Sequence, residues 1–368
     1  MTRAYIVAAC RSPVAPRDGA LSHLSLPDLA APVLRAALSH AGLTLEQVDE
    51  VICSTAIGPG GNPARSIALA AGLPQHVAGL SIDRQCAGGL DALALARKMI
   101  LSGAAEVVVA GGAESYSRQP LRYRTFPDGR PPEAYTQAPF TPWPERDPEM
   151  AQAAAELGLS QGITRQAQDD WAVESHAKAR AHLPADTELV PLAGTENDTF
   201  TRRLTPALCR RARVLTGDIT AANAAVAADA AAFCIVVSER VARDITAPKV
   251  ELLATATKGG TPEEPGLAPL MAIDDVFRQS GLSAGNLDVA EIMEAYAVQA
   301  IACVTGAGIA PGITNLGGGA LARGHPIGAS GAINAVRLWH ELVARGAGTG
   351  LAAIAAAGGI GCAALMRL

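Results

Sequence analysis

Short uninterrupted runs of apolar residues recur along the chain, and between them the apolar positions have helical spacing. Residues 4–9, 107–109 and 233–237 are such runs, and runs of this kind are typical of strands that are buried on both faces. Helical spacing follows residue 86, through Leu90 to Ile100. The pattern therefore predicts an α/β protein whose sheets are covered by helices on both faces.

Two pairs of segments show that this pattern repeats. Residues 86–112 and 329–359 share the order of a turn of small residues, a helix, a buried strand and a glycine pair. Residues 42–53 and 281–293 each follow a helix and lead into a strand. The spacing between the members is similar in both pairs, as expected of an internal repeat. We therefore infer two homologous halves, packed about a pseudo-twofold axis as a duplicated αβαβα five-layer sandwich.

A proline-rich and charged segment interrupts the first half between about residues 118 and 213. It predicts an inserted loop domain with one helix over residues 165–182. We accordingly assign residues 1–244 to the N-terminal half, which carries the insert, and residues 245–368 to the C-terminal half.

Composition argues against several classes of partner and site. The formal net charge of −5 is spread over 35 acidic and 30 basic residues, so nothing favours binding to nucleic acid or to an anionic membrane. The seven cysteines are scattered without a CxxC spacing, which is atypical of disulfide frameworks and structural zinc sites. The first apolar run is too short for a signal peptide, and none reaches the roughly 20 residues of a membrane span. We expect a cytoplasmic globular protein without a bound metal.

Cys86 is the first candidate for chemistry, because it stands where a helical pattern begins. The N–H groups of a first helical turn and the helix dipole stabilise a thiolate, which is the nucleophilic form of cysteine. The small residues Ala87, Gly88 and Gly89 leave room for a substrate. The alternative is a small cysteine buried in the core.

Several motifs occur in the order in which thiolases have them, and the chain resembles this family over nearly its whole length. The most specific match is the glycine-rich segment 317–331, which contains Gly324-His325-Pro326. The other matching segments are residues 6–13, 62–65, 85–86, 110–115 and 168–176.

The resemblance implies the chemistry of the site. It assigns Cys86 as the nucleophile that accepts an acyl group from acyl-CoA, and His325 as the base that deprotonates it. It places the thioester oxygen between the backbone N–H groups of Cys86 and Ala357. A base is also required on chemical grounds, since a thiol with its ordinary pKa is only slightly ionised at neutral pH. The resemblance further implies CoA and acyl-CoA as substrates, no bound cofactor, and a homodimer or homotetramer.

Two positions depart from the thiolase pattern where the enolate forms. Ala355 stands where thiolases have a second cysteine, and an alanine cannot transfer a proton. Some relatives place that cysteine where this chain has Ala295, and Cys303, about 12 Å further along a helix, is assigned to the core. Met293 replaces an asparagine that in thiolases holds a water beside the enolate, and a thioether cannot donate a hydrogen bond.

The segments that bind CoA in thiolases also differ. Ala225 replaces a serine that approaches the pantetheine. Arg210 and Arg211 belong to a basic cluster in the insert, where thiolases bind the nucleotide end of CoA, and guanidinium groups suit phosphates. The alternative for this cluster is a solvated surface. Met293, Ala225, Arg210 and Arg211 are thus the predicted substrate-binding positions.

Two hypotheses for the function follow. The first is a thiolase-type acyltransferase that works through a Cys86 thioester, with its standard thiolytic or Claisen activity reduced or altered. The second is a non-condensing thiolase homologue that serves as an acyl carrier, or as one subunit of a multiprotein acyltransferase complex whose partner supplies the missing groups. Retention of Cys86 and His325 favours the first hypothesis, whereas Ala355, Met293 and Ala225 favour the second.

Overall fold

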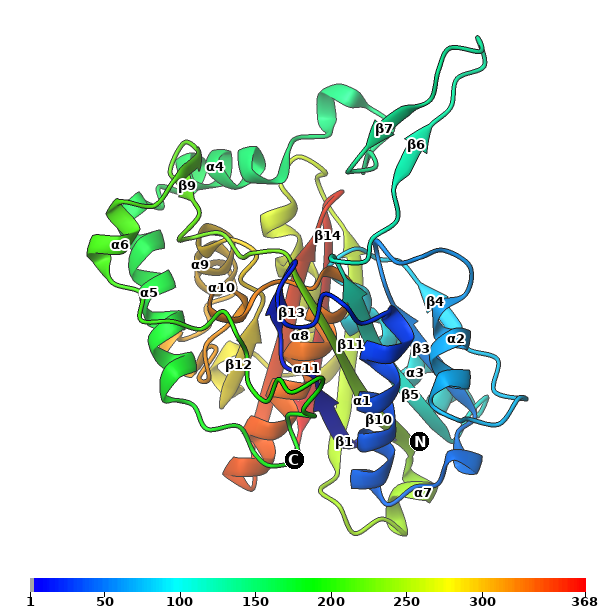
Figure 1. Ribbon diagram of the computed structural model, residues 1–368. Helices are drawn as coiled ribbons and strands as arrows, with labels where there is room; N and C mark the ends of the chain where they lie inside the picture. The colour runs from blue at the N-terminus through cyan, green and yellow to red at the C-terminus, as the bar shows by residue number, and fades with distance from the viewer. Residues whose placement is uncertain (1–2) are drawn as a thin grey trace.

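The computed structural model describes residues 3–368, and its centre is one mixed β-sheet to which both halves of the chain contribute (Figure 1). The strands of the first half lie in the order β4 (Leu80–Ile82), β3 (Glu50–Ser54), β5 (Val107–Ser115), β10 (Ala228–Ser238) and β1 (Ala4–Arg11), with β2 (Ala15–Pro16) paired to β10. Strand β3 is parallel to both of its neighbours, and the remaining pairs are antiparallel. Every residue of β5 and β10 is buried, which explains the uninterrupted apolar runs 107–113 and 230–237 within them.

The second half repeats this topology. Its strands lie in the order β12 (Val289–Ile292), β13 (Thr349–Ala356), β14 (Ile360–Arg367) and β11 (Val250–Gly259). Strands β12 and β13 are parallel, the other two pairs are antiparallel, and a parallel bridge from Ala290 to Thr314 takes the place of β4. The halves meet where β1 pairs with β11 over two residue pairs. This correspondence confirms the duplicated fold.

The two halves of the sheet form two layers, and helices form the other three. Helices α3 (Gly88–Ser102) and α11 (Ile327–Arg345) pack against each other and contact strands of both halves. The outer face of the first half is covered by α1 (Leu26–Ala41) and α2 (Pro63–Ala70), and that of the second half by α8 (Ala268–Ser280) and α9 (Ala297–Gly306).

Two glycines allow the central helices to approach closely. A Cβ atom on Gly89 would lie 2.6 Å from the backbone nitrogen of Ala332, and one on Gly331 would lie 2.5 Å from that of Leu90. Real Cβ atoms do not approach so closely, so glycine sets the spacing of the central layer.

The insert contains more helix than its sequence pattern predicts. Helix α5 (Arg165–Ala181) is present, and its N-cap Thr164 accepts a hydrogen bond from the N–H of Ala167. The expectation of a single helix was wrong, because α4 (Met150–Gln161) and α6 (Pro206–Arg210) also form. Three of the four buried residues of α4 are alanine or glycine, which leave little hydrophobic contrast between its faces.

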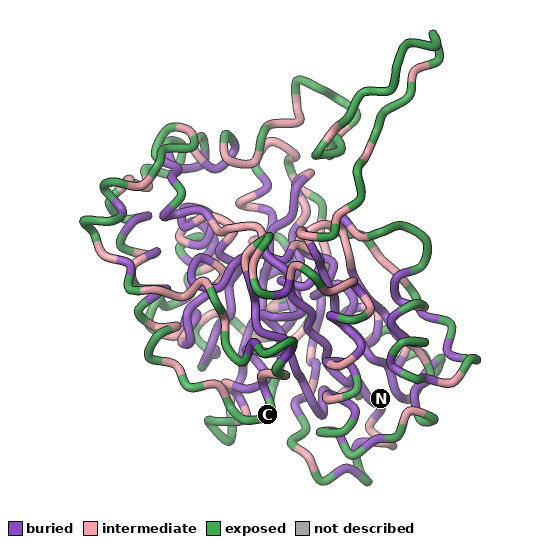
Figure 2. The backbone as a smooth tube through the Cα atoms, in the orientation of Figure 1, coloured by how far each residue is buried: buried purple, intermediate pink, exposed green. Residues whose placement is uncertain are grey.

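The insert also holds the most exposed part of the chain. The hairpin of β6 (Arg122–Arg124) and β7 (Glu133–Tyr135) projects from the body and is largely exposed, whereas the sheet and central helices are buried (Figures 1 and 2). The remaining elements are β8 (Val214–Thr216), β9 (Ile219–Thr220), α7 (Glu239–Arg243), α10 (Ala320–Arg323) and the 3₁₀ helices Leu45–Gln47, Pro144–Arg146, Pro265–Leu267, Ala284–Asn286 and Pro311–Ile313. Within residues 3–368, no helix combines the length and the apolar character that crossing a membrane requires.

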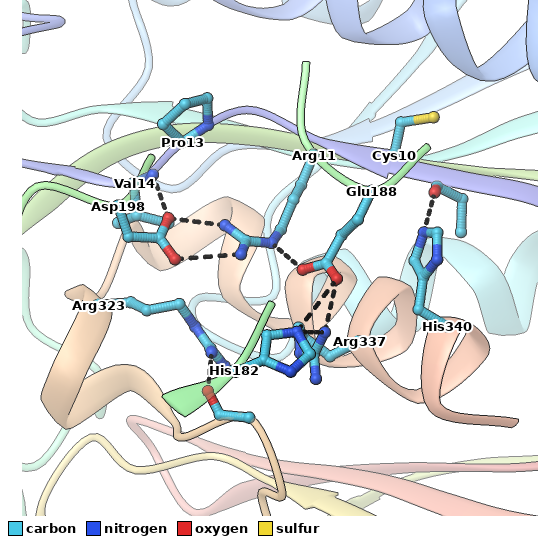
Figure 3. A network of polar contacts seen from close by, with 12 residues as sticks. Cys10, Arg11, Pro13, Val14, His182, Glu188, Asp198, Arg323, Arg337 and His340 are labelled. Atoms are coloured by element: carbon cyan, nitrogen blue, oxygen red, sulfur yellow. Dashed lines mark hydrogen bonds and ion pairs between the residues drawn. The ribbon is translucent and has the colours of Figure 1, made fainter. Parts of the chain in front are cut away.

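A buried network of charges fastens the insert to the core (Figure 3). Arg11 of β1 donates to Glu188 (Nε to Oε1, 2.9 Å) and to Asp198 (Nη1 to Oδ1, 2.7 Å), both from the insert. Arg337 of α11 donates to the second oxygen of Glu188 at 2.6 Å. Burial by itself would raise the pKa of Glu188, but the charges of Arg11 and Arg337 hold it well below its usual value.

Replacing Glu188 with glutamine is expected to lower the free energy of unfolding by about 3–5 kcal/mol, because two buried guanidinium groups lose their shared charge. Urea unfolding at neutral pH measures this effect. Since folding depresses the pKa of Glu188, its contribution is present above the unfolded pKa of about 4.3 and is lost as the pH falls below it. The control is Glu174→Gln, which breaks the more exposed Lys178–Glu174 pair on α5 and should cost less than about 1 kcal/mol. Equal effects of the two changes would contradict this account.

Candidate active site

A cavity of about 310 Å³ lies where the two halves and the insert meet. Its lining combines the loop before α3, the end of β5, the insert with α4, the strand-like segment before β10, the start of α9, the turn before α11 and the end of β13. The lining residues are Gln85, Cys86, Tyr116, Gln137, Phe140, Met150, Ala153, Ala154, Leu157, Ala225, Ala227, Pro265, Gly266, Ala295, Tyr296, Gln299, His325, Ile327, Ala355, Ala356 and Ala357.

Cys86 and His325 face each other in this cavity. The Sγ atom of Cys86 lies 3.1 Å from Nε2 of His325. The other ring nitrogen, Nδ1, lies 2.6 Å from the hydroxyl oxygen of Ser330, which itself donates to the carbonyl of Pro326 at 3.0 Å. Because the Ser330 proton is used in that bond, Ser330 accepts from Nδ1–H, and the lone pair of Nε2 faces the thiol.

The backbone fixes both side chains. Gln85 has a φ of +52°, a strained value for a residue with a side chain. Helix α3 begins at Gly88 with Ala87 as its N-cap, so Cys86 lies just before the helix and does not open it. On the other side, the N–H of His325 donates to the carbonyl of Val226 at 2.7 Å.

Burial keeps the pair uncharged. It raises the pKa of the Cys86 thiol to about 12 and lowers the pKa of His325 to about 4. The expected thiolate is therefore not the resting form: desolvation raises the pKa more than the backbone N–H of Cys86 lowers it. At neutral pH the resting pair is a thiol beside a neutral imidazole.

Glu114, at the end of β5, connects the two halves beneath the site. Its buried carboxylate accepts hydrogen bonds from the Thr55 hydroxyl (2.7 Å), the N–H of Ala56 (2.8 Å) and the N–H of Gly328 (3.0 Å). Gly328 belongs to the first turn of α11, directly after the His325 turn. Glu114 and Ser330 are positioning residues that the sequence analysis did not identify, although both lie within the motifs that carry the thiolase resemblance.

The predicted oxyanion positions lie close to this pair. Ala357 follows β13 and lines the cavity together with Cys86. Within residues 3–368, neither backbone N–H of these two residues has a hydrogen-bond acceptor. Both donors are therefore available to a ligand.

Of the four predicted substrate-binding residues, one lines the cavity and three do not. Ala225 lines the cavity. Met293 is 1% exposed, belongs to the central core and is not part of the cavity lining. Arg210 and Arg211 are exposed at the end of α6, outside the lining. Cys303 is fully buried in the core of the second half.

The lining also contains two tyrosines that the sequence analysis did not single out as site residues. Tyr116 directly follows β5, and Tyr296 is the N-cap residue of α9. A signal was present, because both stand in or beside motifs with thiolase counterparts, and Tyr296 occupies a position where thiolases have phenylalanine.

Comparison with known proteins agrees with this geometry. Residues 4–240 match the thiolase N-terminal domain, and residues 246–368 match the thiolase C-terminal domain. The chain is 36% identical to an acetyl-CoA acetyltransferase of Cupriavidus necator over 99% of this chain and 98% of the relative. It superposes on the crystal structure of the Bacillus anthracis acetyl-CoA acetyltransferase with a TM-score of 0.90 at 31% identity, covering 100% of this chain and 99% of the other. For human mitochondrial 3-ketoacyl-CoA thiolase the TM-score is 0.91 at 28% identity, covering 99% and 98% of the two chains. The chain therefore belongs to the thiolase family of acyltransferases.

Proposed function

We propose that this acyltransferase moves an acyl group from an acyl-CoA through a thioester on Cys86, with His325 as the base. The observation that carries the proposal is the 3.1 Å contact between Sγ of Cys86 and Nε2 of His325 inside a cavity formed by both halves. A cysteine paired with a histidine whose second nitrogen is held by a third group is the arrangement of an activated nucleophile.

Acylation starts from the neutral pair. As Sγ attacks the thioester carbonyl, Nε2 takes the thiol proton, and the same proton then leaves with the CoA sulfur. The hydrogen bond from Nδ1–H to Ser330 keeps the ring in position while the imidazolium exists. The free N–H groups of Cys86 and Ala357 are suited to hold the oxygen as it becomes negative.

The fate of the acyl group depends on the second cysteine of other thiolases, which the described lining residues do not include. Cys86 is the one thiol among the lining residues that the structure describes, and Ala355 and Ala295 line the cavity where a second cysteine stands in other thiolases. We propose that standard thiolytic or Claisen activity is reduced or altered for this reason. We further propose that acyl-CoA binds without a metal or other cofactor, that the chain forms a homodimer or homotetramer, and that Arg210 and Arg211 contact CoA phosphates.

An acyl carrier or complex subunit is the second candidate. It is favoured by the same two alanines, since a thioester formed on Cys86 without a proton-transfer group beside it would persist until a partner supplied one. Turnover in the absence of any other protein separates the two candidates.

Incubation with acetyl-CoA followed by an acid quench is expected to leave an acetyl group on Cys86, which peptide mass spectrometry detects. Cys86→Ala should form no adduct, and His325→Asn should form it about 10²–10⁴ times more slowly. The absence of any adduct on the wild-type chain, with acyl-CoAs of several lengths, would sink the proposed function.

The rate constant for acylation is expected to stay constant between about pH 5.5 and 9.5, because neither group changes its charge in that range. It should fall only as the pH approaches 4, where His325 becomes protonated and can no longer accept the thiol proton. Single-turnover measurements with acetyl-CoA across this range provide the test. A rise with an inflection near pH 8.5, as for an ordinary cysteine, is the contrary result.

Ala355→Cys is expected to raise the rate of acetoacetyl-CoA cleavage by CoA by about 10²–10⁴, the usual effect of a positioned acid–base group. Ala355→Ser is the matched control, since it adds a side chain of similar size whose hydroxyl is a much weaker acid. The idea fails if both variants, or neither, gain activity.

A further inference from the structure

Two tyrosine hydroxyls in the cavity have no partner. Tyr116 and Tyr296 both line the cavity with Cys86, and their side chains are half-buried. Among the residues described, neither hydroxyl forms a hydrogen bond with the protein, and neither is enclosed away from the cavity. A phenol that is largely removed from water normally has a hydrogen-bond partner. These hydroxyls are therefore available to a ligand.

Tyr296 is held by the same short segment that holds the catalytic base. Ala224 forms an antiparallel bridge with Tyr296, and Ala227 forms a parallel bridge with His325. Between them, the N–H of Ala225 donates to the carbonyl of Ala295 at 2.9 Å. The segment from Ala224 to Ala227 therefore holds the backbones of Tyr296 and His325 at a fixed separation.

The electrostatic environment makes Tyr296 a donor. Burial, with smaller contributions from Cys86 and Glu149, raises the pKa of Tyr296 to about 12. The hydroxyl therefore keeps its proton while a thiolate or thioester is handled beside it. The phenol and the sulfur of Cys86 line the same cavity.

We propose that the Tyr296 hydroxyl stabilises the enolate that forms when a 3-oxoacyl-CoA substrate is cleaved. It donates a hydrogen bond to the thioester oxygen of the acyl-CoA fragment that leaves as this enolate. This inference rests on the proposed function of Cys86 and His325. Tyr296 lies beside Ala295 and three residues after Met293, the two positions where this chain lost the groups that serve the enolate in other thiolases. Tyr296 lines the cavity, whereas Met293 is buried in the core. We therefore assign to Tyr296 the role of enolate stabilisation that Met293 cannot fill.

The reaction balances with the groups that line the cavity. His325 takes the Cys86 proton as Sγ attacks the 3-oxo carbon, and the bond between carbons 2 and 3 then breaks. Its electron pair passes to the leaving acyl-CoA as an enolate, whose oxygen accepts from Tyr296. The proton on His325 moves to carbon 2, giving neutral acyl-CoA, the Cys86 thioester and neutral His325. A new CoA thiol gives its proton to His325 as its sulfur takes the acyl group, and that proton returns to Cys86.

The test compares Tyr296→Phe with Tyr123→Phe, which removes a tyrosine hydroxyl from the exposed strand β6, outside the cavity lining. Three quantities are measured for each variant: acetylation of Cys86 by acetyl-CoA, kcat for cleavage of acetoacetyl-CoA by CoA, and deuterium incorporation into the acetyl-CoA methyl group in D₂O. Tyr296→Phe should lower the last two by about 10²–10³ with KM nearly unchanged, the usual effect of losing one oxyanion donor. Acetylation of Cys86 should stay within about threefold of wild type, and Tyr123→Phe should change none of the three.

Each other outcome overturns the inference. These outcomes are deuterium incorporation that is absent from the wild type or unaffected in Tyr296→Phe, equal losses in acetylation and exchange, and an equal loss in Tyr123→Phe. Phenylalanine occupies this position in other thiolases, so the variant is expected to fold, which its urea unfolding midpoint verifies. If the wild type acetylates Cys86 but exchanges no deuterium, the inference on Tyr296 fails while the proposed function stands.

Discussion

The close packing of α3 against α11 is the constraint on which the site depends. Cys86 precedes α3 and His325 precedes α11, so two residues 239 positions apart meet only because these helices run together between the two halves of the sheet. Gly89 and Gly331 set the separation of the helices. The bonds from Glu114 to Ala56 and Gly328 then fix the start of α11 against the first half. The contact between sulfur and nitrogen is thus a property of the whole central layer.

The insert depends on the core in a different way. It supplies one wall of the cavity through Phe140 and α4, and the apolar face of α4 packs against α9. Buried charges attach it as well, with Glu188 shared between Arg11 of the sheet and Arg337 of the central helix. Charges buried in this way are costly unless each has a partner, so the network holds the insert in one position. Substrate-facing residues of the insert are therefore aligned by ion pairs that lie outside the cavity.

Sequence alone predicts the architecture well and the site in part. The apolar runs of β5 and β10 and the repeated segments reveal the sheet and its duplication, because burial on both faces leaves a direct pattern. The pairing of Cys86 with His325 follows from family motifs. What the sequence does not reveal is desolvation, which reverses the expected charge of Cys86, and the burial of Met293 in the core. The alanine-rich α4 and the two unpartnered tyrosines also depend on tertiary contacts that no local pattern records.

The neutral state of Cys86 has a consequence for the durability of the protein. Peroxides and soft electrophiles attack thiolates, and a thiol whose pKa is about 12 exposes very little thiolate at neutral pH. Oxidants that need a thiolate therefore find little of it at neutral pH, whereas a bound thioester is attacked as the thiol proton passes to His325. Selectivity for thioesters over oxidants arises from the same desolvation that makes the resting sulfur inert.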